Sequence, residues 1–389
     1  MNRSSIAFLI LFFLSIAGSA QVGITIDEQK TGDSSVVSRP DKPIKMALLL
    51  PFFKDGGDTT ARQKAFAALS LDYLAGVRAA VDSLEKSGNI MFDLYIEDTE
   101  LDSSIVENIL NKPAFKDMDI IIGPAFASGV DMALYLLANR NTVLYLPFEK
   151  DLKNAGLKYV FLNQKKESAT AAYLADMLGK QAGEKSIVLA YTGKEGKKID
   201  SLIQIQLAEK IDTSRIRMID LASKSNPLGI GSMSSKTEYI MLVYSHDNYY
   251  VNSALKQAKG LNAPVIYGLG EWLEFEDPEY LLWEQLHVKF LTRFFIDFED
   301  EATGNLRKYM IQAYNQDPVE FTYRGFNDMM YLAQTTGTYN ILWPEQCLGK
   351  ESTNCVSGYY WVKDPGTGSV YNGFHCVYNY HNLKLIREK

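Results

Sequence analysis

The sequence predicts an α/β protein in which helices cover both faces of parallel sheets. Strand-like and helix-like stretches alternate along most of the 389 residues, which is typical of this class. The stretch Asp119–Asp131 shows the repeating unit, with an apolar run, a tight turn and a helix start in direct succession. The alternation stops after about residue 162 and then begins again. We therefore expect two α/β halves.

The unit Asp119–Asp131 is also the first place to look for a site. Ile120–Ile122 is a β-branched run that suits a strand buried on both faces. Gly123-Pro124 ends that strand, and Ser128 with Asp131 fits the Ser/Thr-x-x-Asp/Glu capping box that opens a helix. Ligands of open α/β sheets bind in the crevice at the carboxyl ends of the strands.

The first half contains five expected strands. They are Ile44–Leu50, Ile90–Ile96, Asp119–Gly123, Thr142–Leu146 and Tyr159–Leu162. Leu74, Val77, Val81 and Leu84 recur at helical spacing and predict the first helix, with Gly88 as its C-cap. A short helix begins at Asp102 or Ser103, and a third carries Val130, Ala133, Leu134 and Leu137.

The second half repeats this order. Strands are expected at Ser186–Tyr191, Arg215–Ile219, Tyr239–Tyr244 and Pro264–Tyr267, with an extended run at Val288–Ile296. Helices are expected around 170–178, 199–210, 251–258, 281–286, 306–313 and 318–333. Gly358–Val362 and Phe374–Tyr380 predict antiparallel strands around the turn Asp364–Gly368.

Composition excludes some functions. The formal net charge of −7 gives no support for nucleic-acid binding, which needs a clustered basic face. Residues 1–20 carry Arg3, the apolar run Ile6–Ile16 and small residues before Gln21, which predicts a secretory signal peptide. Residues 21–43 predict a flexible linker. We expect a soluble protein exported to the periplasm, with no transmembrane segment in the mature chain.

Chemistry-bearing motifs are sparse. No nucleophile elbow, zinc-protease motif or phosphate-binding loop occurs, so we expect neither catalytic residues nor an enzyme. No Cys-x-x-Cys or His-x-x-x-His spacing occurs, so neither a metal nor a cofactor is expected. An exported protein permits a disulfide, and Cys347–Cys355 is the preferred pair among Cys347, Cys355 and Cys376. Three unpaired thiols are the alternative.

Five segments in the same order resemble the type 1 periplasmic binding protein superfamily. They are KMALLLPF at Lys45–Phe52, LDYLAGVRAAVDSL at Leu71–Leu84, DIIIGP at Asp119–Pro124, VIYGLGEW at Val265–Trp272 and DPVEFTYRGFNDMMYLA at Asp317–Ala333. The superfamily includes the leucine/isoleucine/valine-binding proteins of ABC importers and the LppC-like envelope proteins. The resemblance runs from about Ile44 to the C-terminus and is closest to the Bacteroidota type.

The resemblance implies two Rossmann-like lobes with parallel sheets, joined by a three-stranded hinge. Lobe one is expected at 44–162 plus 297–338, and lobe two at 163–296 plus 339–389. The chain would cross between the lobes three times. A ligand bound between the lobes would favour their closed arrangement.

By the same resemblance, the cleft receives the loops that follow the strands. In lobe one the candidate ligand-binding residues are Phe126, Ser128 and Phe148, and in lobe two they are Tyr191, Ser245, His246, Glu271 and Trp272. Ser128 would hold an anion at a helix start or act only as an N-cap. Glu271 would pair with a ligand ammonium group or be solvated. The aromatic residues would stack on a ligand or pack the lobes together.

Two functions remain open at this point. The first is an exported solute-binding protein that reversibly binds an unidentified small molecule between its lobes and delivers it to an ABC transporter permease. The second is an LppC-like envelope regulator of peptidoglycan synthesis with a degenerate cleft, whose partner is an envelope protein. The amino-acid binders place hydroxyl-rich turns after these strands, whereas this chain has Pro147-Phe148-Glu149-Lys150 after Leu146. That departure weighs against an α-amino-acid ligand.

Overall fold

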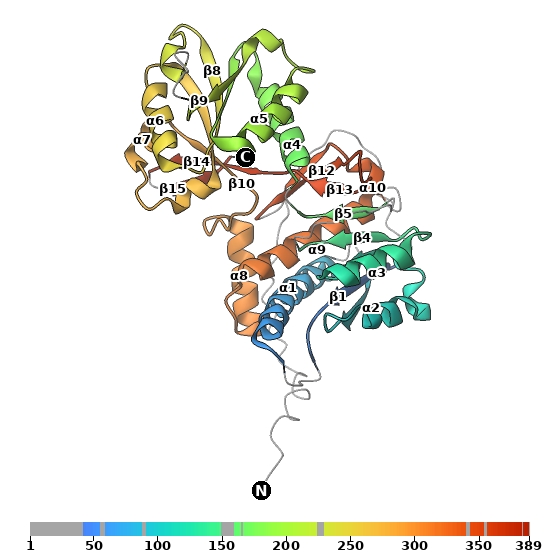
Figure 1. Ribbon diagram of the computed structural model, residues 1–389. Helices are drawn as coiled ribbons and strands as arrows, with labels where there is room; N and C mark the ends of the chain where they lie inside the picture. The colour runs from blue at the N-terminus through green and yellow to red at the C-terminus, as the bar shows by residue number, and fades with distance from the viewer. Residues whose placement is uncertain are drawn as a thin grey trace.

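The chain folds into two lobes, each built on one sheet that is flanked by helices (Figure 1). The computed structural model describes residues 42–54, 59–87, 91–148, 159–164, 166–223, 229–339, 343–353, 356–382 and 384–388. Figure 1 shows the two lobes end to end, with a narrower region of crossing segments between them. The predicted fold class, α/β with two lobes, is confirmed.

The sheet of lobe one has eight strands in the described residues, in the order β11-β12-β13-β5-β4-β3-β1-β2. Their bounds are β1 Ile44–Leu50, β2 Phe92–Asp98, β3 Ile120–Ile122, β4 Val143–Leu146, β5 Val160–Leu162, β11 Glu351–Thr353, β12 Gly358–Lys363 and β13 Val370–Asn372. Strands β1 to β5 and β13 pair in parallel, and only β11–β12 and β12–β13 are antiparallel.

Helices of lobe one come from two separate parts of the chain. They are α1 Ala61–Lys86, α2 Ser103–Leu110, α3 Ala127–Leu137, α8 Glu301–Tyr314, α9 Glu320–Tyr339 and α10 Trp343–Gln346, with the 3-10 turn η1 Pro113–Phe115. Helices α1 and α9 pack closely because glycines face the contact. A Cβ atom added to Gly76 would lie 1.9 Å from the carbonyl oxygen of Thr322.

The sheet of lobe two has seven strands in the described residues, in the order β15-β14-β10-β9-β8-β6-β7. Their bounds are β6 Ser186–Tyr191, β7 Ile216–Asp220, β8 Glu238–Tyr244, β9 Asn262–Leu269, β10 Lys289–Thr292, β14 Cys376–His381 and β15 Lys384–Arg387. The flanking elements are α4 Glu167–Ala182, α5 Gly193–Leu207, α6 Asn248–Ala258, α7 Tyr280–Gln285, η2 Thr213–Arg215, η3 Ile230–Ser232 and η4 Gly270–Glu274.

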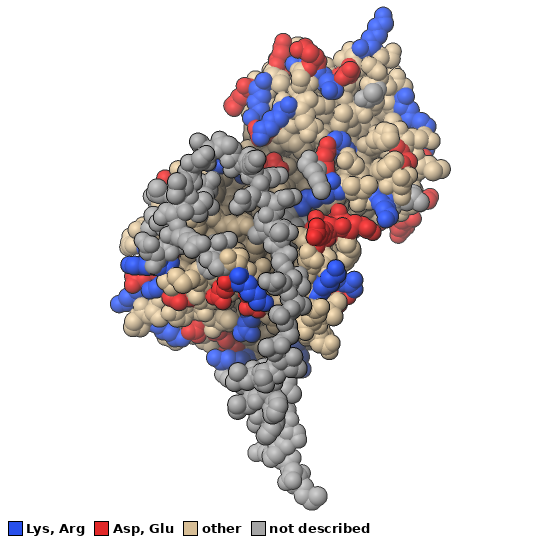
Figure 2. Space-filling model, turned by 180° about the vertical axis from the view of Figure 1, so that it is seen from behind, with Lys and Arg blue, Asp and Glu red and all other residues tan. Residues whose placement is uncertain are grey.

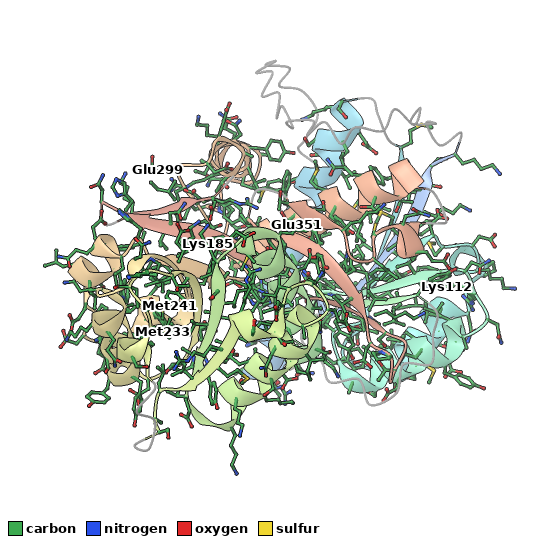
Figure 3. All side chains as sticks on the ribbon, turned by 90° about the horizontal axis from the view of Figure 1, so that it is seen from above. Lys112, Lys185, Met233, Met241, Glu299 and Glu351 are labelled. Carbon is green, nitrogen blue, oxygen red and sulfur yellow. The ribbon has the colours of Figure 1, made fainter. Side chains whose placement is uncertain are left out.

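Each lobe has its own apolar core. The core of lobe two includes Met241 on β8, which is fully buried, and Met233 after η3. Seen from above, both methionines lie within the second lobe, whereas Lys112 lies at the far edge of the first (Figure 3). In lobe one, the predicted isoleucine strand Ile120–Ile122 is completely buried in the middle of the sheet. This strand has no polar residue because helices cover both faces of the sheet.

The chain crosses between the lobes three times. The first crossing runs from β5 to α4, the second from β10 to α8 over residues 293–300, and the third from β13 to β14 over residues 373–375. The number of crossings matches the expectation. The third crossing was expected near residue 339, and that prediction is wrong because β11, β12 and β13 still belong to the sheet of lobe one.

The C-terminal strands therefore differ from the prediction in two ways. Residues 351–372 belong to lobe one, since β13 pairs in parallel with β5. The expected antiparallel pairing of Gly358–Val362 with Phe374–Tyr380 does not form. Instead, β12 pairs with β13 across the predicted turn at Asp364–Gly368, and β14 pairs with β10 in the other lobe. The third crossing separates two strands that lie close together in sequence.

The start of α3 also differs from the prediction. The helix begins at Ala127 with Phe126 in the N-cap position, and no side chain caps it. Ser128 lies inside the first turn and is exposed, so the expected capping box with Asp131 is not formed. The preceding Gly123-Pro124 peptide is cis. The strand-to-helix turn is thus made by the backbone and by the packing of Phe126 rather than by a hydroxyl cap.

Several predictions lie outside the described residues. They concern the signal peptide at 1–20, all but the last residues of the linker at 21–43, the C-cap Gly88, and Cys355. Within the parts of the chain that are described, we find no helix that combines the length and apolarity needed to cross a membrane.

Candidate functional site

A cavity lies where the strands of lobe two end, next to the second and third crossings. It has a volume of about 440 Å³. We call it the strand-end cavity. It is lined by Thr170, Leu174, Tyr244, Leu269, Gly270, Glu271, Leu273, Glu274, Leu291, Thr292, Arg293, Phe294, Phe295 and His375. Its position at the carboxyl ends of β8, β9 and β10 is the one at which open α/β sheets bind ligands.

The polar side chains of this cavity include both signs of charge. Glu271 and Glu274 come from η4, and because a 3-10 helix has three residues per turn, their side chains lie on the same side of it. Arg293 supplies a guanidinium group from the start of the second crossing. The remaining wall is largely apolar. A molecule with an apolar body and a charged group fits this lining better than a purely apolar one.

Tyr244 stands at the end of β8 and brings a hydroxyl group to the cavity. Burial, together with the carboxylates of Glu195 and Glu271, raises the pKa of Tyr244 above its ordinary value. The phenol therefore stays protonated and can donate a hydrogen bond to a ligand.

Two glycines in the sequence Gly268-Leu269-Gly270 shape the wall of the cavity. Gly268 leaves space for the indole ring of Trp272, since an added Cβ atom would lie 2.3 Å from its Cζ3 atom. Trp272 is fully buried, and its Nε1 donates a 2.8 Å hydrogen bond to the carbonyl oxygen of Ser245. Gly270 lies tightly against Thr292 and the carbonyl of Leu291 on the neighbouring β10. This packing fixes η4, and with it the two glutamates.

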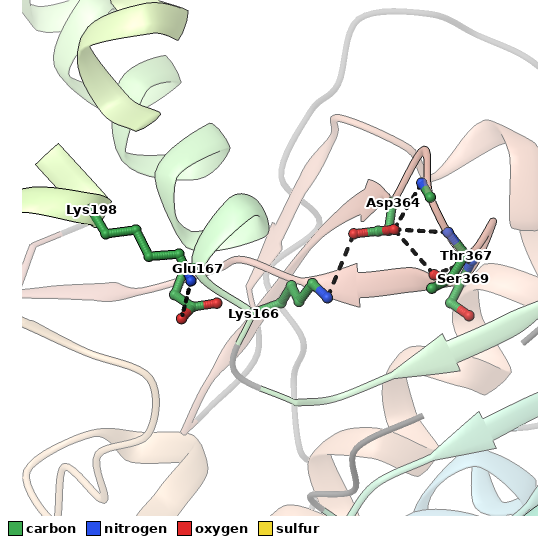
Figure 4. Close-up of polar contacts among 7 residues, drawn as sticks. Lys166, Glu167, Lys198, Asp364, Thr367 and Ser369 are labelled. Atoms are coloured by element: carbon green, nitrogen blue, oxygen red, sulfur yellow. Dashed lines mark hydrogen bonds and ion pairs between the residues drawn. The ribbon is translucent and has the colours of Figure 1, made fainter. Parts of the chain in front are cut away.

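The crossings beside the cavity are tied together by polar side chains. Asn372 donates a 3.0 Å hydrogen bond from Nδ2 to Oδ1 of Asn163, which joins the third crossing to the first. Figure 4 shows the start of α4, where Lys166 faces Asp364 of lobe one at 3.7 Å and Glu167 pairs with Lys198 of lobe two at 3.0 Å. Adjacent residues at the end of the first crossing therefore pair with opposite lobes.

The three candidate residues of lobe one do not line the strand-end cavity. Phe126 is half-buried and its ring covers Gly129 of α3. Ser128 is exposed. Phe148 packs within lobe one, with its ring stacked on Phe321 at 5.9 Å between centroids. The role of these three side chains in ligand binding stays a prediction.

In lobe two, only Glu271 of the five candidates lines the cavity. Tyr191 is buried at the end of β6. Ser245 is buried and accepts a 2.8 Å hydrogen bond from the hydroxyl of Thr192, and His246 is exposed beside Tyr244. Trp272 lies beneath the cavity wall. The cavity thus lies at the predicted strand ends, while the side chains that line it are mostly neighbours of the predicted ones.

The sequence analysis missed Arg293, Thr292, Thr170 and His375. Arg293 was hidden in the aromatic run Val288–Ile296, where it is the first charged residue after Lys289. His375 lies in no recognisable motif of the sequence. The third crossing brings it to the cavity, and its Nδ1 lies 2.9 Å from the carbonyl oxygen of Gly373.

The cysteines do not add to this site. Cys347 and Cys376 are buried free thiols, and burial raises the pKa of both. The free thiol at Cys347 does not support the predicted bridge to Cys355. Because Cys355 lies outside the described residues, the pairing stays a prediction.

The surface charge shows no single-sign face in the view of Figure 2, where basic and acidic side chains are interspersed over both lobes.

No family model and no curated protein matches the chain. Solved structures do match. A protein assigned as a branched-chain amino acid ABC transporter from Rhodospirillum rubrum aligns with a TM-score of 0.54 at 11% identity, over 89% of this chain and 100% of the other. Full-length LpoA from Haemophilus influenzae aligns with a TM-score of 0.55 at 14% identity, over 89% of this chain and 59% of LpoA.

The C-domain of the same LpoA, described as a regulator of PBP1A, aligns with a TM-score of 0.52 at 14% identity over its whole length. The chain thus aligns with the whole C-domain and with 59% of the full-length LpoA. Identities at this level establish the fold alone. With two helix-flanked sheets and three crossings, the chain has the type 1 periplasmic binding protein fold that it shares with these structures.

Proposed function

We propose that this chain is a binding protein that reversibly holds a small positively charged or zwitterionic molecule in the strand-end cavity. The observation that carries the proposal is the pairing of Glu271 and Glu274 on one side of η4, both facing the cavity. Two neighbouring carboxylates at one wall favour a cationic partner such as an ammonium group. The volume of about 440 Å³ falls in the range of small-molecule pockets.

Arg293 and Tyr244 extend the proposed recognition. Arg293 can pair with a carboxylate or another anionic group of the same molecule. The hydroxyl of Tyr244 can donate to an uncharged polar group. The leucines and phenylalanines of the lining would contact the apolar body of the ligand. In this proposal lobe one closes over the ligand by rotation about the crossings, with Phe126, Ser128 and Phe148 as the residues that would approach it.

We further propose that the protein is exported to the periplasm and delivers its ligand to an ABC transporter permease. The apolar segment at residues 6–16 and the shared fold with a transporter-associated protein support this. N-terminal sequencing of the protein from a periplasmic extract should give Gln21 as the first residue. Recovery of the intact N-terminus from the cytoplasm would contradict export.

The binding proposal is tested by a thermal-shift screen of residues 21–389. The screen contains amines, amino acids, short peptides, nucleosides, sugars and peptidoglycan fragments. A ligand at about 100 times its dissociation constant stabilises by about 2.7 kcal/mol, which raises Tm by at least about a degree for a chain of this size. We expect hits among molecules that carry an ammonium group.

Matched variants decide whether a hit occupies the strand-end cavity. Glu271→Gln and Glu274→Gln remove one negative charge each and should weaken the hit. Glu276→Gln is the control, because Glu276 is exposed in the same segment and does not line the cavity. A hit that all three variants keep at full strength would place the ligand elsewhere.

A second candidate function is an envelope interaction protein of the LpoA kind. The alignment with the entire C-domain of LpoA, a regulator of PBP1A, supports this second function. The alignment with the transporter protein supports the solute-binding function to the same extent. In that case the partner would be a peptidoglycan synthase of the PBP1A type. The ligand screen should then be flat for a well-folded protein, and the purified synthase should bind residues 21–389 directly. Saturable binding of a small amine without any synthase binding would exclude this candidate.

A further inference from the structure

A second, smaller pocket lies on the lobe-one side of the crossings. Its volume is about 140 Å³. We call it the hinge pocket. Its polar lining is Asn163, Arg293, Arg324, Asn327, Asp328 and Ser357, and Phe294 forms an apolar wall. Since one water takes about 30 Å³ in the liquid, the pocket holds about four or five waters, or one carboxylate or phosphate group.

Two guanidinium groups reach this pocket from different parts of the structure. Arg293 belongs to the second crossing and Arg324 to α9 of lobe one. Arg324 is held in place by a 2.6 Å ion pair with Glu320 and by stacking over the ring of Phe294 at 5.1 Å. The planar fork of arginine matches the geometry of carboxylate and phosphate oxygens.

The carboxylate that lines the pocket is already engaged. Asp328 is buried, and its oxygens accept hydrogen bonds from Tyr73 at 2.8 Å, Tyr145 at 2.7 Å and Tyr359 at 2.6 Å. Burial raises the pKa of Asp328, which reduces its negative charge further. Two arginines therefore line the pocket with one carboxyl group of reduced negative charge, and Glu320 balances part of the charge of Arg324 from outside the lining.

The amide of Asn163 contacts both charged partners in the pocket, and its Oδ1 also accepts the 3.0 Å hydrogen bond from Asn372. Nδ2 of Asn163 lies 3.4 Å from Oδ1 of Asp328, and Oδ1 of Asn163 lies 3.4 Å from Nη2 of Arg293. Both distances are at the long end for hydrogen bonds. Ser357 also lines the pocket, and its hydroxyl donates a 2.8 Å hydrogen bond to the backbone carbonyl oxygen of Arg293.

We propose that the hinge pocket binds a small oxyanion, a carboxylate or a phosphate group, between Arg293 and Arg324. The site is distinct from the strand-end cavity, although Arg293 and Phe294 line both. Its ligand would contact the first and second crossings and α9 at once. Binding therefore ties the crossings to lobe one and reduces the freedom of the lobes to move.

Isothermal titration calorimetry of residues 21–389 with phosphate, sulfate and acetate tests the proposal, with chloride at matched ionic strength as the reference. We expect saturable binding of at least one oxyanion. Arg324→Gln should weaken that binding about tenfold or more, because a charge-assisted hydrogen bond is lost. Arg293→Gln should weaken it similarly, and it serves as the second variant if Arg324→Gln does not fold.

Arg307→Gln is the matched control. Arg307 also pairs with a carboxylate, Asp317, but it lies on α8 and does not line the pocket. The Arg307→Gln variant should bind the anion with the same affinity as the unmodified protein. No saturable binding of any oxyanion, or equal affinity in Arg324→Gln and Arg293→Gln, would overturn the proposal. Preference for acetate over phosphate would identify a carboxylate ligand, and the reverse a phosphate.

This test is independent of the function proposed above. Glu271→Gln and Glu274→Gln should leave the oxyanion affinity unchanged, since neither residue lines the hinge pocket. Loss of oxyanion binding in those variants would contradict a separate site.

Discussion

The hydroxyl of Tyr145 on β4 donates a 2.7 Å hydrogen bond to Oδ1 of Asp328 on α9, 183 positions further along the chain. Tyr73 on α1 and Tyr359 on β12 bond to the same carboxyl group. One buried side chain thus connects two helices with the parallel and the antiparallel strands of lobe one. The hydroxyl groups supply donors that an isolated buried carboxylate would lack.

We expect Asp328→Asn to destabilise the fold by about 2–4 kcal/mol, because an amide offers one acceptor oxygen and turns a donor toward a tyrosine hydroxyl. Tyr145→Phe removes a single donor and should cost about 1 kcal/mol. Urea unfolding measures both. Asp317→Asn is the control, since Asp317 forms an exposed ion pair with Arg307, and it should change the free energy of unfolding far less than Asp328→Asn does. Equal effects of Asp328→Asn and Asp317→Asn would refute this account of the network.

Gly76 and Gly325 let α1 and α9 approach closely. A Cβ atom would lie 1.9 Å from the carbonyl oxygen of Thr322 at the first position, and 2.1 Å from that of Tyr73 at the second. Gly76→Ala or Gly325→Ala must therefore push the helices apart, and we expect a loss of about 1–3 kcal/mol or more.

Gly304→Ala on α8 provides the contrast, because nothing lies within 4 Å of its added Cβ atom. Alanine favours the helix by about 1 kcal/mol there, so this variant should be as stable as the unmodified protein or more stable. Thermal unfolding of the three variants shows the difference. A tolerated Gly76→Ala would mean that the helix contact adapts more easily than the distances imply.

The strands of the parallel sheets could be predicted closely because they are buried on both faces and carry continuous apolar runs. The predicted Ile44–Leu50 and Ser186–Tyr191 agree with β1 and β6 at both ends. The third crossing could not be predicted. Strands β12 and β14 have similar aromatic patterns, and only packing against different lobes separates them. Local sequence carries no signal for that choice.

The strand ends that border the cavity could be located from the sequence, but most of the side chains that line it could not. Glu271 follows the strand that carries the Gly268-Leu269-Gly270 turn, and it faces the cavity as expected. Trp272 is the next residue and points into the core instead, because Gly268 leaves space for its ring there. Arg293 and His375 reach the cavity through crossings whose paths depend on both lobes.

The side-chain oxygen and nitrogen of Asn372 both form hydrogen bonds at the third crossing. Its Oδ1 accepts from the backbone amides of Tyr360 and Phe374 at 3.0 Å each, and its Nδ2 donates to Asn163 and to the carbonyl of Gly358. Asn372→Ala would leave buried backbone groups unpaired, and we expect a loss of about 2–4 kcal/mol. Hydrogen exchange at the amides of Tyr360 and Phe374 should also become faster.

The exposed Asn141 is the control for this change. Asn141→Ala should alter neither the free energy of unfolding beyond about 0.5 kcal/mol nor the exchange of those two amides. If Asn372→Ala left both amides equally protected, other contacts would be sufficient to order the third crossing.

Asp200 is a buried carboxyl group whose two oxygens have no hydrogen-bond partner among the described residues. It lies on the apolar face of α5, one turn from Gly196 and from Ile203, and near the hydroxyl groups of Tyr191 and Tyr244. Burial raises the pKa of Asp200 to about 8. The folded protein therefore favours the protonated form, whereas the unfolded chain releases this proton near pH 3.8, the ordinary value.

The sign of the resulting pH dependence follows from these two values. The favourable contribution of protonated Asp200 is complete below the unfolded pKa and is lost as the pH rises toward about 8. In that window this one group lowers the free energy of unfolding by up to about 1.4 kcal/mol per pH unit. Asp200→Asn cannot titrate. Its free energy of unfolding should therefore rise relative to the unmodified protein as the pH increases.

Urea unfolding of both proteins at several pH values between about 5 and 8 gives the two free energies of unfolding. Because all other titrating groups are the same in both proteins, their contributions cancel in the difference. Asp131→Asn, at an exposed position of α3, is the control and should run parallel to the unmodified protein. A constant difference between Asp200→Asn and the unmodified protein across this range would mean that Asp200 does not change its protonation on folding. It would then have to find a partner, such as a bound water, that balances its charge.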